Sequence, residues 1–186
     1  MRKLKLQMQI SVDGFVAGPE GQLDWMAPMG ADERLLSFVN HLTDTSDTIL
    51  LGRKMTEGFV QYWEHAASQP NSPEYAFARK MVDTPKIMFS RSAHSVRGQN
   101  IQVENGSIVE AVNRLKQQTG KDIIVYGGAN FVSSLLENGL IDELNLFVNP
   151  VAIGKGMQIF GARRALQLAA STAYKNGIVV NTYQPR

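Results

Sequence analysis

The stretch of this sequence best suited to chemistry runs from Thr48 to Phe59. It opens with aliphatic and β-branched residues typical of a buried strand. A strand, a glycine turn and a helix N-terminus together present unpaired backbone N–H groups to an anion. We predict that the glycine lets a phosphate approach the backbone, that the two cations supply positive charge and that the threonine donates a hydroxyl hydrogen bond. The residues of this predicted phosphate site are Gly52, Arg53, Lys54, Met55 and Thr56. The alternative is an ordinary strand-to-helix junction with a solvated basic turn.

Two further junctions carry similar chemistry. Each follows a short aliphatic strand, one expected over residues 86–89 and the other over residues 123–126. A dinucleotide fits three such junctions in order, with its pyrophosphate at the two glycine-opened helix N-termini. An additional 2′-phosphate would be held by a serine and an arginine through charge-assisted hydrogen bonds. The residues concerned are Ser90, Arg91 and Ser92 at one junction, and Gly127, Gly128, Ala129 and Asn130 at the other. The GxGxxG fingerprint is absent from the sequence.

These junctions need a sheet to position them. Residues 4–12 alternate between apolar and polar with a period of two, which predicts a strand. The loop after it begins with Val12, Asp13 and Gly14, and loops at strand ends are where α/β sheets usually meet ligands. Further along, Trp25 could wall a pocket or simply fill the core.

The remaining pattern predicts helices alternating with strands and then a final hairpin. Helical spacing or capping signals start near residues 32, 53, 73, 108 and 129. Strands are expected over 143–148, 166–174 and 178–183, and Asn176-Gly177 is a strong hairpin signal between the last two. We therefore predict an α/β fold whose mostly parallel central sheet carries an antiparallel C-terminal hairpin and is covered by helices on both faces.

The composition and charge of the chain limit the classes of function that it can have. The chain has 186 residues with 44% hydrophobic and 19% charged content, which predicts one folded domain over residues 1–186. The formal net charge of +2 argues against nucleic-acid and membrane partners. The sequence has no cysteine and its three histidines are widely separated, so we expect no metal site. The charged, alternating N-terminus is unlike a signal peptide, and we expect a cytoplasmic protein.

Taken together, the motifs resemble those of a known family. The order of the matching segments is that of the dihydrofolate reductase-like superfamily, and more closely of its riboflavin-biosynthesis branch, the reductase domain of RibD-type proteins. The resemblance covers nearly the whole chain and rests on residues 11–17, 51–56, 89–91, 125–129, 139–144, 149–151 and 154–156.

This resemblance implies a three-layer αβα fold that binds NADPH. The two glycine turns would hold the pyrophosphate and the nicotinamide ribose, and Ser90 with Arg91 would hold the 2′-phosphate. The substrate would lie between the first loop and the first helix, where we assign substrate contacts to Val12, Gly14 and Trp25 and catalytic roles to Asp13 and Asp32. Asp32 or Glu33 is the candidate for the substrate-binding carboxylate on the first helix. Alternatively, these are acidic residues favoured by the helix dipole.

Several functions remain open at this point. The resemblance favours NADPH-dependent reduction of a pyrimidine or pterin-like heterocycle, in particular of 5-amino-6-(5-phosphoribosylamino)uracil. Dihydrofolate reduction is an alternative, although Asp24-Trp25 replaces that enzyme's Pro-Trp pair. A non-catalytic nucleotide- or flavin-binding module and a scaffold are the others. We also expect a homodimer, with residues 144–148 in its interface.

Overall fold

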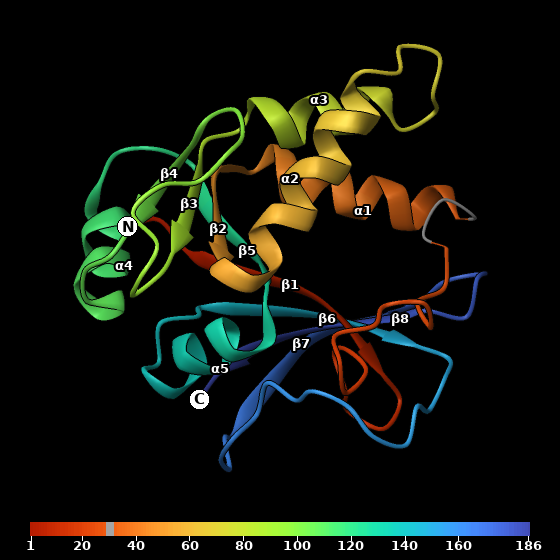
Figure 1. Cartoon of the computed structure of the whole chain (residues 1–186). Helices are drawn as coiled ribbons and strands as arrows, with labels where there is room; N and C mark the ends of the chain where they lie inside the picture. The colour runs from red at the N-terminus through yellow and green to blue at the C-terminus, as the bar shows by residue number, and fades with distance from the viewer. Residues whose placement is uncertain (29–31) are drawn as a thin grey trace.

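One sheet runs through the part of the chain described by this computed structural model, residues 1–28 and 32–186 (Figure 1). Its eight strands lie in the order β4-β3-β2-β5-β1-β6-β8-β7. The pairs from β4 through β6 are parallel, whereas β8 pairs antiparallel with both β6 and β7. The strands are β1 (Leu4–Ser11), β2 (Ser46–Gly52), β3 (Lys86–Phe89), β4 (Ile101–Glu104), β5 (Asp122–Gly127), β6 (Glu143–Asn149), β7 (Leu166–Ala173) and β8 (Val179–Pro185). The predicted α/β class, mixed sheet and C-terminal hairpin are confirmed.

Helices cover both faces of this sheet. Apolar residues of α4 and α5 join one core cluster, and those of α1, α2 and α3 join the other. In the view of Figure 1, α1, α2 and α3 gather above the sheet and α5 lies below it. The helices are α1 (Glu33–Asp44), α2 (Arg53–Ala67), α3 (Tyr75–Asp83), α4 (Ile108–Gln117) and α5 (Ala129–Glu137). The predicted three layers are therefore present. Among the described residues, no helix has the length and apolar character that crossing a membrane requires.

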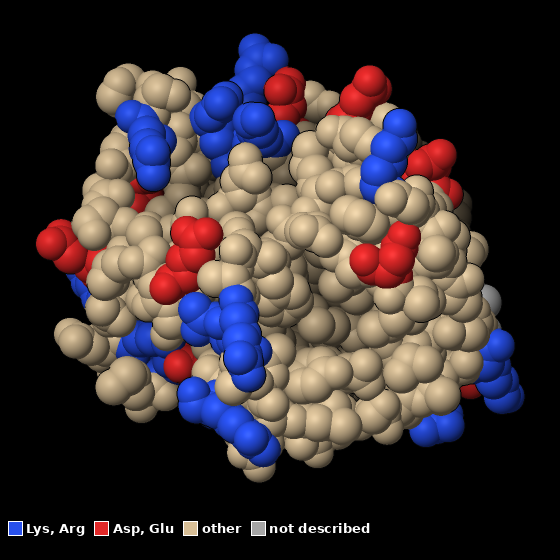
Figure 2. Space-filling view, turned by 90° about the horizontal axis from the view of Figure 1, so that it is seen from below, with Lys and Arg blue, Asp and Glu red and all other residues tan. Residues whose placement is uncertain are grey.

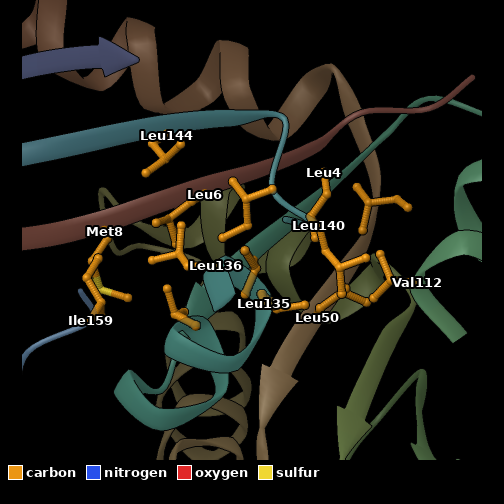
Figure 3. Close-up of a cluster of buried hydrophobic side chains, with 14 of the residues drawn as sticks. Leu4, Leu6, Met8, Leu50, Val112, Leu135, Leu136, Leu140, Leu144 and Ile159 are labelled. Atoms are coloured by element: carbon orange, nitrogen blue, oxygen red, sulfur yellow. The ribbon is translucent and has the colours of Figure 1, made fainter. Parts of the chain in front are cut away.

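The central strand β1 is covered on both sides. Its residues Leu4 and Leu6 are fully buried and face Leu135 and Leu136 of α5 in the first core (Figure 3). The alternate residues point to the opposite face, which α1 covers, and among them Gln7 is only 7% exposed. Polar residues of β1 that alternation alone would place in solvent are therefore buried, because neighbouring strands and helices enclose β1 completely.

The predicted dimer interface is corrected by the sheet order. The segment Leu144–Val148 belongs to β6, which lies between β1 and β8 and is largely buried. It is therefore interior to the subunit. The edge of the sheet at that end is β7, where Leu168 is 53% exposed.

Candidate cofactor and substrate site

The three predicted junctions meet at one edge of the sheet. They follow β3, β2 and β5, which are adjacent parallel strands, so their carboxyl ends point the same way. At about 4.8 Å between neighbouring strands, the outer two junctions are about 10 Å apart. Figure 2 looks onto the end of the molecule toward which these strands run. That face is hollowed near its middle, where uncharged side chains line the hollow, and charged side chains stand around it.

The two glycine turns are in direct contact. A Cβ atom added to Gly52 would lie 2.7 Å from Cβ of Phe131 and 3.0 Å from the backbone nitrogen of Gly128. Gly127 has a φ of 141°, and a Cβ atom there would lie 2.8 Å from the sulfur of Met55. Each turn therefore needs glycine, because the other turn and its helix occupy the space that a side chain would take.

Both helices that start at these turns have free N-termini. Gly52 caps α2 and Gly128 caps α5, and neither helix has a side-chain cap or an acidic residue in its first turn. By contrast, Asp32 caps α1 and Ser107 caps α4 through their side-chain oxygens. The first backbone N–H groups of α2 and α5 thus lie close together with no acceptor among residues 1–28 and 32–186, which is the arrangement that binds a phosphate group.

Positive charge lies at the same place. Arg53 and Lys54 open α2, are exposed, and make no ion pair with any described residue. At the start of α5, Ala129 packs against the core and Asn130 is exposed. These residues lie at the starts of α2 and α5, and positive charge beside two helix N-termini suits an anionic ligand.

Thr56 is the exception at this junction. Its hydroxyl donates to the carbonyl oxygen of Gly52 at 3.0 Å, and the residue is 1% exposed. The predicted hydroxyl bond from Thr56 to a ligand is therefore corrected: this side chain closes the first turn of α2 instead, as threonine hydroxyls commonly do.

The junction after β3 forms a tight turn. The hydroxyl oxygen of Ser90 accepts N–H bonds from Ser92 at 3.2 Å and from Ala93 at 2.9 Å. Arg91 projects from this turn, is exposed, and pairs with no acidic group among the described residues. Ser90 thus fixes the turn and leaves the Arg91 guanidinium available to an anion at the end of the row.

Asp13 connects two loops. Its carboxylate accepts the Ser11 hydroxyl at 2.6 Å and the backbone N–H groups of Gly154 at 2.7 Å and Ile153 at 3.2 Å. The Ser11 hydroxyl, followed by the two backbone donors, lowers the pKa of Asp13 below its usual value. Asp13 is therefore ionised at neutral pH and holds the first loop against the 150–157 loop. These contacts give Asp13 a structural role, and its predicted catalytic role stays a prediction.

Asp32 is likewise structural. One oxygen accepts N–H bonds from Arg34 at 2.9 Å and Leu35 at 3.2 Å, and the other accepts the N–H of Lys175 at 2.6 Å. The Lys175 contact, followed by those of α1, lowers the pKa of Asp32. It caps α1 and ties it to the C-terminal hairpin, and its predicted catalytic role stays a prediction. Its neighbour Glu33 is exposed in the first turn of α1.

The Asp32 contacts predict a pH dependence of stability. A carboxylate whose pKa is lowered in the folded state stabilises that state above its unfolded pKa, near 4, and loses this contribution as pH falls further. We expect Asp32→Ala to lower the thermal midpoint by several degrees at neutral pH, and the difference from wild type to shrink below about pH 4. Thermal unfolding between acidic and neutral pH measures this.

Asp24→Ala is the matched control, because Asp24 is exposed and makes no hydrogen bond or ion pair with a described residue. An equal effect of Asp24→Ala would contradict the stabilising role of the Asp32 contacts.

The predicted substrate residues lie in two different environments. Val12 is 65% exposed on the first loop, and Gly14 adopts a φ of 90° in the same turn. Trp25 is half-buried, and its indole N–H donates to the carbonyl of Gln22 at 3.1 Å. The structure keeps Val12 and Gly14 together and places Trp25 on the separate 23–28 segment, which also reaches the end of the sheet.

Two amide side chains, whose contacts the sequence does not predict, hold that segment. Asn149 is fully buried at the end of β6 and accepts the N–H of Ala27 at 2.9 Å. The same amide donates to Gln9 of β1 at 2.7 Å. In the sequence, Asn149 stands out only as an amide at the end of a strand and directly before a proline. That pattern does not predict its contact with Ala27.

Comparisons with known proteins identify the family and the fold of the chain. Residues 2–180 match the RibD C-terminal domain family. The chain belongs to this family. Among curated relatives, the uncharacterized protein YyaP of Bacillus subtilis (strain 168) is 32% identical over 185 residues, which cover 98% of this chain and 94% of YyaP.

Solved structures show the same fold. The deaminase/5-amino-6-(5-phosphoribosylamino)uracil reductase of Thermotoga maritima aligns with a TM-score of 0.67 and 14% identity, over 100% of this chain and 57% of that one. Dihydrofolate reductase from Enterococcus faecalis, solved with NADP(H), aligns with a TM-score of 0.63 and 16% identity, over 99% and 96% of the two chains. This chain therefore has a dihydrofolate reductase-like fold and corresponds to a little over half of the bifunctional protein.

Proposed function

We propose that this RibD C-terminal domain protein is an NADPH-dependent reductase of a pyrimidine-type heterocycle, such as 5-amino-6-(5-phosphoribosylamino)uracil. The observation that carries the proposal is the contact between two uncapped helix N-termini, those of α2 and α5, beside cations that form no ion pair within the described part of the chain. Membership of the family and the reductase named among the structural relatives support the reaction type.

Different residues of this chain would bind different groups of the cofactor. The N–H groups that follow Gly52 and Gly128 would receive the pyrophosphate, with Arg53 and Lys54 neutralising its charge. Arg91, on the adjacent β3 turn, would take the 2′-phosphate. Bound NADPH supplies the hydride, and the protein supplies position and electrostatics.

The substrate would lie beside the 23–28 segment and the end of β1. Trp25 offers a flat apolar surface for a ring there, and the loop held by Asp13 closes the same end of the sheet. Dihydrofolate reduction is less well supported, because the only acidic candidates at the start of α1 are Asp32, whose oxygens are bonded, and exposed Glu33. The homodimer and the cytoplasmic location stay predictions, and the exposed edge for a dimer contact would be β7.

Titration of tryptophan fluorescence with NADPH and with NADH tests the cofactor. Trp63 belongs to an aromatic cluster with Phe59, Tyr62 and Phe77. It lies about 16 Å along α2 from Gly52, so it is remote from the site and would add background signal. We therefore expect the variant Trp63→Phe, in which Trp25 alone reports, to show saturable quenching that is tighter for NADPH than for NADH.

Turnover separates the reductase from a binding module. We expect NADPH absorbance to fall when the phosphoribosylamino-uracil is added, and to remain unchanged with dihydrofolate. Binding of NADPH without oxidation by pyrimidines, pterins or folates would favour a non-catalytic nucleotide-binding module. Absence of saturable binding by either nucleotide would refute the proposed function while leaving the fold intact.

A further inference from the structure

The turn that carries Arg91 lies in a segment with little regular structure. Residues 91–100, between β3 and β4, form neither helix nor strand, and most of them are exposed. Within the 90–93 turn, the Ser90 hydroxyl oxygen accepts the N–H groups of Ser92 and Ala93. These bonds join residues that are two or three positions apart, so they set the shape of the turn but not its position on the molecule.

Asn105, the first residue after β4, attaches this turn to the sheet. Its side-chain Nδ2 donates to the carbonyl oxygens of Ser90 and Ala93, each at 2.7 Å. One of these carbonyls lies directly before Arg91 and the other lies two residues after it. Within residues 1–28 and 32–186, no other hydrogen bond joins residues 91–98 to a part of the chain outside the turn. The two N–H groups of one amide therefore hold both ends of the turn.

The residues on either side of Asn105 are themselves held in place. Strands β3 and β4 are parallel neighbours, and beyond β3 the Ser90 N–H donates to the Glu104 carbonyl oxygen at 3.1 Å. The Glu104 carboxylate accepts the N–H of Gly106 at 2.8 Å and pairs with Arg114 of α4 at 2.6 Å. Asn105 therefore reaches the turn from a backbone that the sheet and α4 fix on both sides.

Such an anchor matters because of what Arg91 would bind. A guanidinium recognises a phosphate group through parallel N–H bonds, which require a defined position and direction of the side chain. If the turn moved freely, binding would have to order it, and the lost conformational entropy would weaken the affinity. Holding the backbone on both sides of Arg91 before binding removes that cost.

We infer that Asn105 is a positioning residue for cofactor selectivity, which holds both ends of the 90–93 turn and so places Arg91 where the 2′-phosphate of NADPH would lie. This inference rests on the proposed function and adds a residue that touches neither cofactor nor substrate. NADH lacks the group that Arg91 would meet. Loss of the Asn105 amide should therefore weaken the binding of NADPH and leave that of NADH unchanged.

The test replaces Asn105 with leucine, which has a similar size and no hydrogen-bonding group. By calorimetric titration, we expect the affinity for NADPH to fall about threefold to tenfold and the affinity for NADH to stay the same. Asn105 is exposed, so its replacement opens no cavity in the core. Asn71→Leu is the matched control, because Asn71 is an exposed loop asparagine whose side chain makes no hydrogen bond with a described residue. It should leave both affinities unchanged.

A double-mutant cycle with Arg91→Ala separates positioning from general destabilisation. If Asn105 acts through Arg91, adding Asn105→Leu to the Arg91→Ala variant should lower NADPH affinity no further. Equal losses of NADPH and NADH binding in Asn105→Leu would overturn the inference. A loss of the same size with and without Arg91 would overturn it as well, because the amide would then act independently of that side chain.

Limited proteolysis with trypsin examines the turn without any nucleotide. Trypsin cleaves after arginine, and Arg91 and Arg97 both lie in the exposed segment. We expect cleavage at these two positions to be severalfold faster in Asn105→Leu than in wild type, because the turn has lost its attachment. Cleavage at the wild-type rate would overturn the inference.

Failure of the proposed function would show itself separately. Wild type that binds NADPH in preference to NADH but oxidises it with no pyrimidine would contradict the reductase, whereas reduced selectivity in Asn105→Leu would still support the positioning role. Wild type that binds neither nucleotide would overturn both.

Discussion

Replacing Arg91 with alanine is expected to weaken NADPH binding by about tenfold to hundredfold and to leave NADH binding unchanged. The reason is that a charge-assisted hydrogen bond contributes about 1.5–3 kcal/mol, and only NADPH carries the 2′-phosphate that Arg91 would meet. Arg91 is exposed and pairs with no acidic group that the structure describes, so its removal disturbs nothing in the fold. Fluorescence titration of both nucleotides in the Trp63→Phe background measures the selectivity.

Arg79→Ala is the control for this prediction. Arg79 is also an exposed arginine, but it lies beside Ser46 and Lys121 at the amino ends of the strands, away from the glycine turns. It pairs with Asp83 one helical turn along, a contact that contributes little. Equal losses of NADPH and NADH binding in Arg91→Ala would remove the 2′-phosphate role, and an Arg79→Ala effect of the same size would show that only general charge matters.

Replacing Gly52 with alanine is expected to destabilise the protein by about 1–3 kcal/mol, as overpacking does. The added Cβ would lie 2.7 Å from the Phe131 Cβ and 3.0 Å from the Gly128 nitrogen, so α5 and its glycine turn must move away from α2. Because the two turns would hold one pyrophosphate between them, we also expect NADPH affinity to fall at least tenfold. Chemical denaturation and nucleotide titration report the two effects separately.

Gly58→Ala supplies the matched control within the same helix. Gly58 lies in the interior of α2, and a Cβ there would have no neighbour within 4 Å. Alanine should therefore stabilise the protein by about 1 kcal/mol through helix propensity and leave NADPH binding unchanged. If Gly52→Ala behaved like Gly58→Ala in both measurements, the contact between the two turns would have no part in binding the cofactor.

The sequence by itself determined the elements and the three junctions. The alternation of residues 4–11, the Asn176-Gly177 turn and the glycines after β2 and β5 are local signals, and each produced the expected strand, hairpin or helix start. Such signals work because strand and helix periodicity and turn conformation depend on residues a few positions apart. The family pattern supplied the order of the junctions along the chain.

Tertiary structure decided which groups remain available for chemistry. The sequence does not reveal that Asp32 accepts the backbone N–H of Lys175, 143 positions further along the chain. Thr56 turns its hydroxyl inward, and Gln7 appears solvent-facing in the alternation although β5, β6 and α1 enclose it. The physical reason is common to all three: hydrogen-bond partners and burial are set by elements distant in sequence, and no local pattern records which strands become neighbours.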